Sequence, residues 1–364
     1  MMFENCFRNK KVLITGNTGF KGSWLSSWLL KLGAKVYGLS NGIPTDPSLY
    51  EILSLKNKIK HYDADVRDLD RIKEIFQEVA PDFIFHLAAQ SIVSKSYEDP
   101  ISTISTNVIG TSVVLEALRK LENDCIVVII TSDKCYDNLE WAWGYRETDR
   151  LGGKDIYSGS KAAAEIVINS YHNSFLKHNK RIRIATCRAG NVIGGGDWAQ
   201  DRIVSDCMRA WSSGKPVNIR SPEATRPWQH VLEPLSGYLR LAQFMESNNS
   251  LNGESFNFGP RSQHNHTVRN LLKDLSFEWN LSHEPYSVVD EIPFKEAGLL
   301  KLNCDKALFH LGWEATLDYE DTVNFTSQWY SLYYGELEDM VKFTLNQITV
   351  FEKKAIKLGQ VWSK

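Results

Sequence analysis

Residues 11–22 read KVLITGNTGFKG, and this stretch decides the fold. The apolar run from Val12 to Ile14 predicts a buried strand, and glycines follow it at every third position. Beyond them, apolar residues recur at the spacing of a helix: Trp24, Leu25, Trp28, Leu29 and Leu32. The stretch therefore predicts a strand, a tight glycine turn and a helix, in that order.

The three glycines suit a loop that holds phosphate groups. Gly16 can make the tight turn, Gly19 lets the backbone approach a pyrophosphate, and Gly22 lets the helix pack closely on the strand. The N-terminus of the helix then offers N–H groups and a partial positive charge to the phosphates. A plain tight turn is the alternative, but the strand and helix on either side favour a dinucleotide site.

The composition is that of an ordinary folded protein and excludes several classes. The chain has 364 residues, of which 43% are hydrophobic and 24% charged, with a formal net charge of −2. That balance argues against nucleic acid and membrane surfaces as partners, because no basic excess exists to hold phosphates along a backbone. No apolar run is long enough to span a membrane, and the length predicts two closely associated lobes.

The cysteines and the N-terminus indicate the compartment. Six cysteines are scattered without C-x-x-C spacing, so we expect free thiols and no metal site. The N-terminus carries no long apolar segment of the kind that directs secretion. We therefore expect a cytoplasmic protein.

Six further stretches predict strands, and helical patterns lie between most of them. The strands are expected at residues 34–39, 59–62, 82–87, 126–130, 183–188 and 256–258. Strands that alternate with helices are typical of a parallel sheet. The run at 126–130 has only apolar residues, as expected for a strand that is buried on both faces.

A polar cluster follows the strand at residues 126–130. It reads TSDKCY over residues 131–136, and open α/β sheets place their chemistry at the carboxyl ends of such strands. Tyr157 comes 25 residues after Ser132, and Lys161 comes four residues after Tyr157. That spacing puts the tyrosine and the lysine on one face of a helix, for which a plain solvated surface is the alternative.

This group of side chains suits proton removal from a hydroxyl group while a hydride is transferred. A phenol has a pKa of about 10 and is a poor base at neutral pH. A nearby ammonium group and a positive nicotinamide ring both favour the phenolate, so we expect a lowered pKa for Tyr157. Ser132 would hydrogen-bond the substrate hydroxyl that is oxidised.

The G-x-x-G-x-x-G spacing, Ser132 and the Y-x-x-x-K motif together resemble the extended short-chain dehydrogenase/reductase family of NAD-dependent nucleotide-sugar epimerases and dehydratases. The resemblance implies an α/β fold, a Rossmann-type doubly wound parallel sheet of about seven strands with a smaller, interleaved C-terminal substrate lobe. It places the NAD-binding domain at residues 1–187, with contributions from about 228–262. The nucleotide-sugar lobe and C-terminal helices would take residues 188–227 and 263–364.

The resemblance implies NAD as the cofactor. Ser40 and Asn41 stand at the end of the second strand, where an NAD enzyme normally has Asp or Glu, so we expect weaker NAD binding. NAD is still favoured over NADP, because no arginine lies between Ser40 and Tyr50. The implied cofactor-binding residues are Gly16, Asn17, Thr18, Gly19, Phe20, Lys21, Gly22, Asp65, Val66, Leu87, Ala88, Ala89, Thr131, Tyr157 and Lys161.

The two residues after Ser132 resemble one branch of the family, the CDP-glucose 4,6-dehydratases. Dehydratases of the family carry an acid and a base directly after the hydroxyl residue, usually Asp-Glu, and here the pair is Asp133-Lys134. Oxidation at C4 of the sugar acidifies the C5 proton, which Lys134 would remove. Asp133 would give a proton to the departing C6 hydroxyl. A surface Asp-Lys dipeptide is the alternative, and the position after Ser132 argues against it.

Further residues match positions that the family uses for the nucleotide sugar. The stretches NVIGGGDW at 191–198 and RPWQHVLEP at 226–234 resemble the CDP-glucose branch more than the dTDP- or GDP-sugar branches. The helices that begin near Pro100 and Asp155 are those through which the family dimerises, so a homodimer is expected. The implied substrate-binding residues are Gln90, Ser132, Asn191, Arg202, Arg220 and Arg226.

The resulting hypothesis is a hydro-lyase that converts CDP-D-glucose to CDP-4-dehydro-6-deoxy-D-glucose and water, as a step in deoxysugar synthesis of the O-antigen or polysaccharide type. Its catalytic residues would be Ser132, Asp133, Lys134, Tyr157 and Lys161. The steps are C4 oxidation, elimination of water across C5 and C6, and hydride return to C6. Two alternatives stay open. One is an NAD-dependent epimerase or 4,6-dehydratase for a dTDP-, UDP- or GDP-linked sugar, and the other is a non-catalytic NAD-binding protein.

Overall fold

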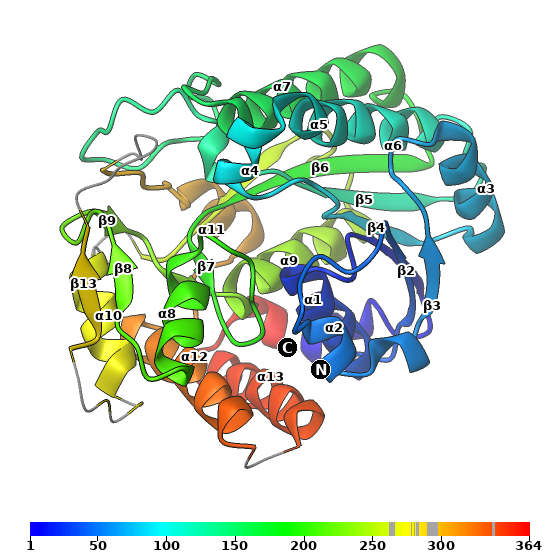
Figure 1. Cartoon of the computed structure of the whole chain (residues 1–364). Helices are drawn as coiled ribbons and strands as arrows, with labels where there is room; N and C mark the ends of the chain where they lie inside the picture. The colour runs from blue at the N-terminus through cyan, green and yellow to red at the C-terminus, as the bar shows by residue number, and fades with distance from the viewer. Residues whose placement is uncertain (262–265, 278, 280, 282–283, 290–297, 337–338) are drawn as a thin grey trace.

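The centre of the molecule is a parallel sheet of seven strands, seen in a computed structural model that describes residues 1–261, 266–277, 279, 281, 284–289, 298–336 and 339–364 (Figure 1). The spatial order is β11-β6-β5-β4-β1-β2-β3, and every neighbouring pair is parallel. The predicted doubly wound α/β fold is confirmed. The strands are β1 (Lys11–Thr15), β2 (Lys35–Ser40), β3 (Lys60–Asp63), β4 (Phe83–His86), β5 (Cys125–Ile130), β6 (Ile182–Ala189) and β11 (Ser255–Phe258).

Helices cover both faces of the sheet, and side chains that alternate along each strand fill two separate cores. On β5, Ile126 and Val128 join the core shared with α1 (Phe20–Lys31) and α9 (Leu232–Ser247). Val127 and Ile129 point into the opposite core. That second core is closed by α3 (Leu69–Val79), α6 (Gly110–Leu118) and α7 (Ile156–Tyr171).

The glycine turn holds β1 and α1 in close contact. Gly16 has a φ of +75°, a conformation that L side chains rarely adopt. A Cβ atom on Gly22 would lie 2.2 Å from the carbonyl oxygen of Gly16, so only a glycine fits there. The turn therefore fixes where the N-terminus of α1 lies.

The helical pattern from Pro100 forms one irregular helix. It comprises α5 (Pro100–Ile104), a single π-helical turn (Ser105–Ile109) and α6. Asn107 lies in the π turn, and its side chain bonds the backbone of Gln90 and the hydroxyl of Ser160, which ties the β4 exit loop to α7. Among the described residues, this helix alone is long and apolar enough to cross a membrane, a test that buried helices of water-soluble proteins also pass.

The second half of the chain builds smaller sheets and a group of helices beside the main sheet. Three two-stranded sheets pair β7 with β10, β8 with β13 and β9 with β12. These strands are β7 (Val192–Ile193), β8 (Val217–Ile219), β9 (Thr225–Arg226), β10 (Gln229–His230), β12 (His266–Thr267) and β13 (Tyr286–Val288). The remaining helices are α2 (Leu49–Ile52), α4 (Val93–Glu98), α8 (Ile203–Ser212), α10 (Val268–Phe277), α11 (Asp305–Leu311), α12 (Tyr319–Tyr334) and α13 (Met340–Lys357).

Clusters of aromatic side chains join segments that are distant in the sequence and account for several of the eleven tryptophans. The ring of Phe3 stacks on Trp362 with centroids 5.1 Å apart and meets Trp28 edge-on at 5.8 Å. Phe351 of α13 stacks on the same Trp362 at 5.5 Å. The two chain ends therefore lie side by side against α1 (Figure 1).

The glycine turn yields a stability prediction. Gly22→Ala should destabilise the fold by about 1–3 kcal/mol, because the new methyl group meets rigid backbone. Gly159→Ala is the matched control, since a Cβ at that helical position meets nothing within 4 Å. Urea unfolding of both variants measures the difference. Equal stabilities would contradict the prediction.

Candidate active site

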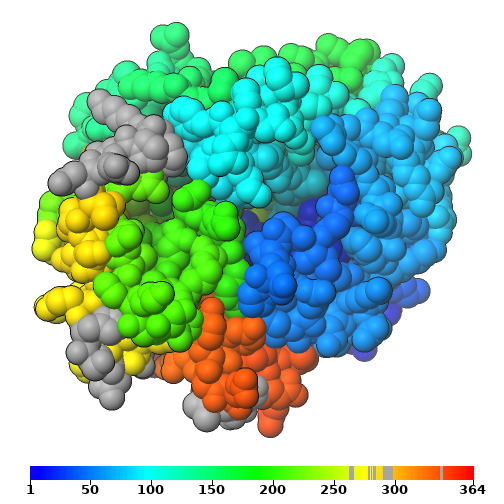
Figure 2. Space-filling view, in the orientation of Figure 1, coloured from blue at the N-terminus to red at the C-terminus, as the bar shows by residue number. Residues whose placement is uncertain are grey.

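A cavity of about 780 Å³ opens at the carboxyl edge of the sheet. Its lining combines the glycine turn, the residues that follow β2, β4 and β5, and residues 196–200 and Arg202 from the second half of the chain. Figure 2 shows the hollow between the blue N-terminal part, the cyan helices and the green segment. Ligands of open parallel sheets bind at this edge.

Most of the predicted cofactor residues meet in this cavity. Asn17 is the exception, because its side chain is fully buried below the turn and accepts a hydrogen bond of 2.8 Å from the Ser40 hydroxyl. The cavity is lined by Gly16, Thr18, Gly19, Phe20, Lys21, Gly22, Asp65, Val66, Leu87, Ala88, Ala89, Thr131, Tyr157 and Lys161.

The start of α1 fits a diphosphate. Gly19 occupies the N-cap, and no described side chain accepts a hydrogen bond from the first turn there. The N–H groups of that turn can therefore bind phosphate oxygens. A glycine turn, an uncapped helix N-terminus and a nearby lysine together suit a dinucleotide.

At the end of β2, Ser40 and Asn41 stand where an NAD enzyme normally has a carboxylate. The Ser40 hydroxyl also accepts a hydrogen bond of 3.3 Å from the Thr18 N–H, so it supports the glycine turn. Asn41 donates to the Asp65 carboxylate at 3.3 Å, and Arg67 donates to it at 2.9 and 2.6 Å. Arg67 holds the pKa of Asp65 below its ordinary value. This arginine lines the cavity, although it lies outside the 40–50 stretch in which the sequence analysis sought one.

The polar cluster after β5 forms a short 3₁₀ helix, Asp133–Cys135, that is capped by Ser132. The Ser132 hydroxyl accepts a hydrogen bond of 3.2 Å from the Lys134 N–H and donates one of 3.0 Å to the Asp133 carboxylate. Ser132, Tyr157 and Lys161 all line the cavity. The structure therefore brings together the serine, tyrosine and lysine that the sequence analysis selected.

Burial has the largest effect on the pKa values of Tyr157 and Lys161. It raises the pKa of Tyr157 to about 12, and the hydrogen bond with Ser132 counters this only in part. The prediction of a lowered pKa for Tyr157 is therefore wrong for the protein without a bound cofactor. Burial lowers the pKa of Lys161 to about 8, so its ammonium form still predominates at neutral pH.

The two predicted dehydration residues, Asp133 and Lys134, begin the short 3₁₀ helix that follows Ser132. Asp133 is buried and lies directly against Gly190, where a Cβ atom would come within 1.7 Å of a carboxylate oxygen. Lys134 is half-buried. Neither residue belongs to the cavity lining, whereas the preceding residue, Ser132, does.

The predicted substrate residues are dispersed. Arg202 lines the cavity, donating to Asp197 at 2.6 Å and to Ser91 at 3.1 Å. Gln90 lies outside the lining, because its amide donates to Thr103 at 2.8 Å and to the backbone of Ile92. The other residues outside the lining are Asn191, Arg220 and Arg226, of which Arg226 donates to the Thr225 and Gly298 carbonyls and Arg220 lies 3.9 Å from Asp201.

Cations gather around the cavity. Lys21, on the first turn of α1, has its pKa lowered to about 8 by burial and by the charges of Arg202 and Lys161. Three further cations of the lining were not predicted from the sequence, Arg67, Lys95 and Arg209. No local motif identifies these three, although Arg209 follows Arg202 at a spacing that places both near one side of α8.

A glycine-turn Rossmann-type sheet with serine, tyrosine and lysine at its carboxyl edge defines an extended short-chain dehydrogenase/reductase. The family model described as GDP-mannose 4,6 dehydratase matches residues 13–326. The chain belongs to this family, which confirms the resemblance seen in the sequence.

Relatives and solved structures agree with that assignment. The chain is 42% identical over 353 residues to the CDP-glucose 4,6-dehydratase of Salmonella typhimurium, covering 96% of this chain and 98% of that protein. A UDP-glucose-4-epimerase from Stenotrophomonas maltophila with bound NAD superposes with a TM-score of 0.78 at 21% identity, covering 90% and 99% of the two chains. A dTDP-glucose 4,6-dehydratase from Bacillus anthracis in complex with NAD gives 0.75 at 20% identity, covering 92% and 99%. These two structures show the shared fold.

The contact between Asp133 and Gly190 yields a prediction. Gly190→Ala should leave the fold intact, because only the end of the Asp133 side chain has to move, but it should lower turnover by about 100-fold through misplacement of that carboxylate. Steady-state kinetics and unfolding midpoints measure the two effects, with Gly159→Ala as the control. Wild-type turnover in Gly190→Ala would contradict a catalytic role for Asp133.

The lysines of the cavity yield a pH prediction. Lys21 and Lys161 are charged below their pKa of about 8 and lose that charge above it. The affinity for a dinucleotide should therefore be level up to about pH 7 and fall as pH rises through about 8. Calorimetric titrations across this range measure it. Lys21→Gln should bind more weakly at neutral pH and show a smaller decline; an equal decline would exclude Lys21.

Proposed function

We propose that this protein is a 4,6-dehydratase that converts CDP-D-glucose to CDP-4-dehydro-6-deoxy-D-glucose and water with NAD as its cofactor. One observation carries the proposal: the buried Asp133 is hydrogen-bonded to Ser132, which shares the cavity with Tyr157 and Lys161. The identity of 42% to a CDP-glucose 4,6-dehydratase, over nearly the whole of both chains, supports the choice of substrate.

The chain supplies groups for each proton movement. When bound, NAD would supply the hydride acceptor for C4 and a positive ring charge beside Tyr157. Tyr157 takes the proton of the C4 hydroxyl, which Ser132 holds by a hydrogen bond. Lys134 takes the C5 proton, and Asp133 gives a proton to the C6 oxygen as it leaves. Return of the hydride to C6 and of a proton to C5 would complete the product.

The cations of the cavity suit the diphosphates of both ligands. The first turn of α1 and Lys21 would hold the dinucleotide, and Lys161 would hold its ribose. Arg202 reaches the cavity from the second half of the chain, where a guanidinium group fits the phosphate oxygens of a nucleotide sugar. The sequence-based assignments of Gln90, Asn191, Arg220 and Arg226 to that substrate stay predictions.

We further propose a cytoplasmic homodimer, with the apolar helix Pro100–Leu118 and α7 at its interface. The two helices pack side by side (Figure 1) and expose large apolar side chains. Ile101 is 75% exposed and Ile109 51% on the first helix, and Ile166 is 55% exposed on the second. Apolar surface of this kind is normally covered by a partner. A second copy would cover it and would also account for the apolar composition of the helix without a membrane.

An isotope experiment tests the reaction. The protein is incubated with NAD and CDP-glucose that carries deuterium at C4, and the product is analysed by mass spectrometry. We expect loss of water with the deuterium moved to C6. Unchanged mass with an inverted centre would indicate an epimerase. No turnover of CDP-, dTDP-, UDP- or GDP-glucose would indicate a non-catalytic NAD-binding protein.

Variants of the acid–base pair refine the test. Asp133→Asn should still oxidise C4 but lose water more slowly, and an unchanged elimination rate would remove Asp133 from its role. Lys134→Gln should lose the exchange of the C5 proton with solvent. Retained exchange of the C5 proton in Lys134→Gln would remove Lys134 from the role of the base.

A further inference from the structure

A buried ion pair lies directly behind the catalytic segment, which we define as residues 131–136. It joins Glu165 on α7 to Arg188 on β6, and each side chain is only 3% exposed. Arg188 donates from Nε to one carboxylate oxygen of Glu165 at 2.9 Å and from Nη2 to the other at 2.8 Å. Two parallel bonds of this kind fix both the distance and the orientation of the partners.

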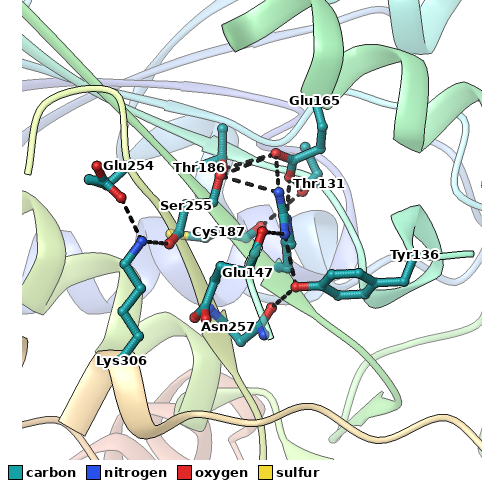
Figure 3. A network of polar contacts seen from close by, with 11 residues as sticks. Thr131, Tyr136, Glu147, Glu165, Thr186, Cys187, Glu254, Ser255, Asn257 and Lys306 are labelled. Atoms are coloured by element: carbon teal, nitrogen blue, oxygen red, sulfur yellow. Dashed lines mark hydrogen bonds and ion pairs between the residues drawn. The ribbon is translucent and has the colours of Figure 1, made fainter. Parts of the chain in front are cut away.

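The pair holds the catalytic segment at both ends. The Thr131 hydroxyl donates to Glu165, and Arg188 donates to the Tyr136 hydroxyl at 2.8 Å. Tyr136 in turn donates to the side chain of Asn257 on β11 at 2.8 Å. Figure 3 shows these groups converging from separate elements. Thr131 and Tyr136 flank Ser132, Asp133 and Lys134, so the chemistry lies between two anchored ends.

The same pair is connected to the helix that carries the tyrosine and the lysine. Glu165 comes four residues after Lys161 and eight after Tyr157, so the three side chains share one face of α7. A shift of Glu165 relative to the catalytic segment would therefore change the distance between Tyr157 and Ser132. Neither Glu165 nor Arg188 lines the cavity, and protein groups bond both oxygens of the Glu165 carboxylate, so we assign the pair no direct contact with the substrate.

Further bonds satisfy the remaining polar atoms of the pair. Thr186 donates to the second carboxylate oxygen of Glu165 at 3.2 Å, and Arg188 donates to the Glu147 carbonyl at 3.0 Å. Burial works against the charge of Glu165, but Arg188 and the neighbouring hydroxyls keep its pKa below the ordinary value. Both members of the pair therefore stay charged at neutral pH.

We propose that the Glu165–Arg188 pair is a positioning element, which keeps Ser132 and Asp133 in register with Tyr157 and Lys161. The roles of these four residues rest on the proposed function. A buried ion pair gives weak support to stability, since well-packed apolar residues often replace one without loss. Catalytic groups, by contrast, must be held within a fraction of an ångström, which interlocked bonds achieve.

Glu165→Gln is the first test, because it keeps the shape of the side chain and removes its charge. We expect kcat for dehydration to fall by about 100-fold while KM stays within about threefold, since the substrate contacts remain and the alignment is lost. Glu352→Gln is the matched control. Glu352 is also a buried carboxylate, 6% exposed, that pairs with Lys31 and accepts from Trp28, and it lies outside the cavity lining. An unchanged kcat in Glu165→Gln would overturn the proposal.

Two more variants separate positioning from stability. Arg188→Lys keeps the charge but loses the two parallel hydrogen bonds of the guanidinium group, so kcat should fall less than in Glu165→Gln. The double variant Glu165→Leu with Arg188→Met leaves no buried charge unpaired, so its stability should recover toward that of the wild type. Its kcat should stay low, because the anchors of Thr131 and Tyr136 are gone. Recovery of kcat together with stability would show a merely structural pair and overturn the proposal.

Hydrogen exchange gives a readout that needs no substrate. Amides of residues 131–136 should exchange faster in Glu165→Gln than in the wild type and in Glu352→Gln. Equal exchange in all three proteins would overturn the proposal. The activity of the wild type with CDP-glucose is tested independently of these exchange rates. An inactive wild type would end the proposed function, while the exchange rates would still decide whether the pair anchors the segment.

Discussion

All seven strands of the sheet run in one direction, and the rest of the structure depends on that constraint. Parallel neighbours need helical crossovers, which cover both faces and bring every carboxyl end to the same edge. The glycine turn follows β1, Ser132 follows β5 and Gly190 follows β6, so groups far apart in the sequence meet there. The glycine turn and the segment after β4 are in close contact, since a Cβ on Gly16 would lie 2.8 Å from the Ala88 nitrogen.

The parts of this arrangement that could be predicted from the sequence are those fixed by local pattern. The strand, the glycine turn and the helix follow one another in consecutive residues. The alternation of strands and helices then implies the parallel sheet. Tyr157 and Lys161 stand one helical turn apart, so their common face follows from spacing alone. Ser132 follows an all-apolar strand, so its place at the carboxyl edge follows from the fold. Arg202 was selected by family likeness and not by any pattern, and it lines the cavity.

What escaped prediction depends on neighbours that the sequence does not place. Gln90 has the residue type of a substrate ligand, yet its amide is taken up by Thr103 and by the backbone of Ile92. Arg67 reaches the cavity from the end of β3, beyond the segment where an arginine was sought. The pKa of Tyr157 rises because the folded chain buries the phenol, an effect that no spacing reveals. The pair of Glu165 and Arg188 likewise joins a helix to a strand, and neither residue forms part of a motif.

The cations of the cavity connect ligand binding to catalysis. Burial keeps the pKa of Lys161 at about 8, and burial together with the charges of Arg202 and Lys161 keeps the pKa of Lys21 at about 8. A bound diphosphate favours the ammonium forms, so it raises these pKa values by the same free energy with which the lysines favour its binding. The hydrogen bond with Ser132 and the charge of Arg202 lower the pKa of Tyr157, but they offset the effect of burial only in part. The phenol therefore needs a further positive charge beside it before it can act as a base, and the nicotinamide ring of bound NAD would supply that charge, which would confine proton removal to the complex with the cofactor.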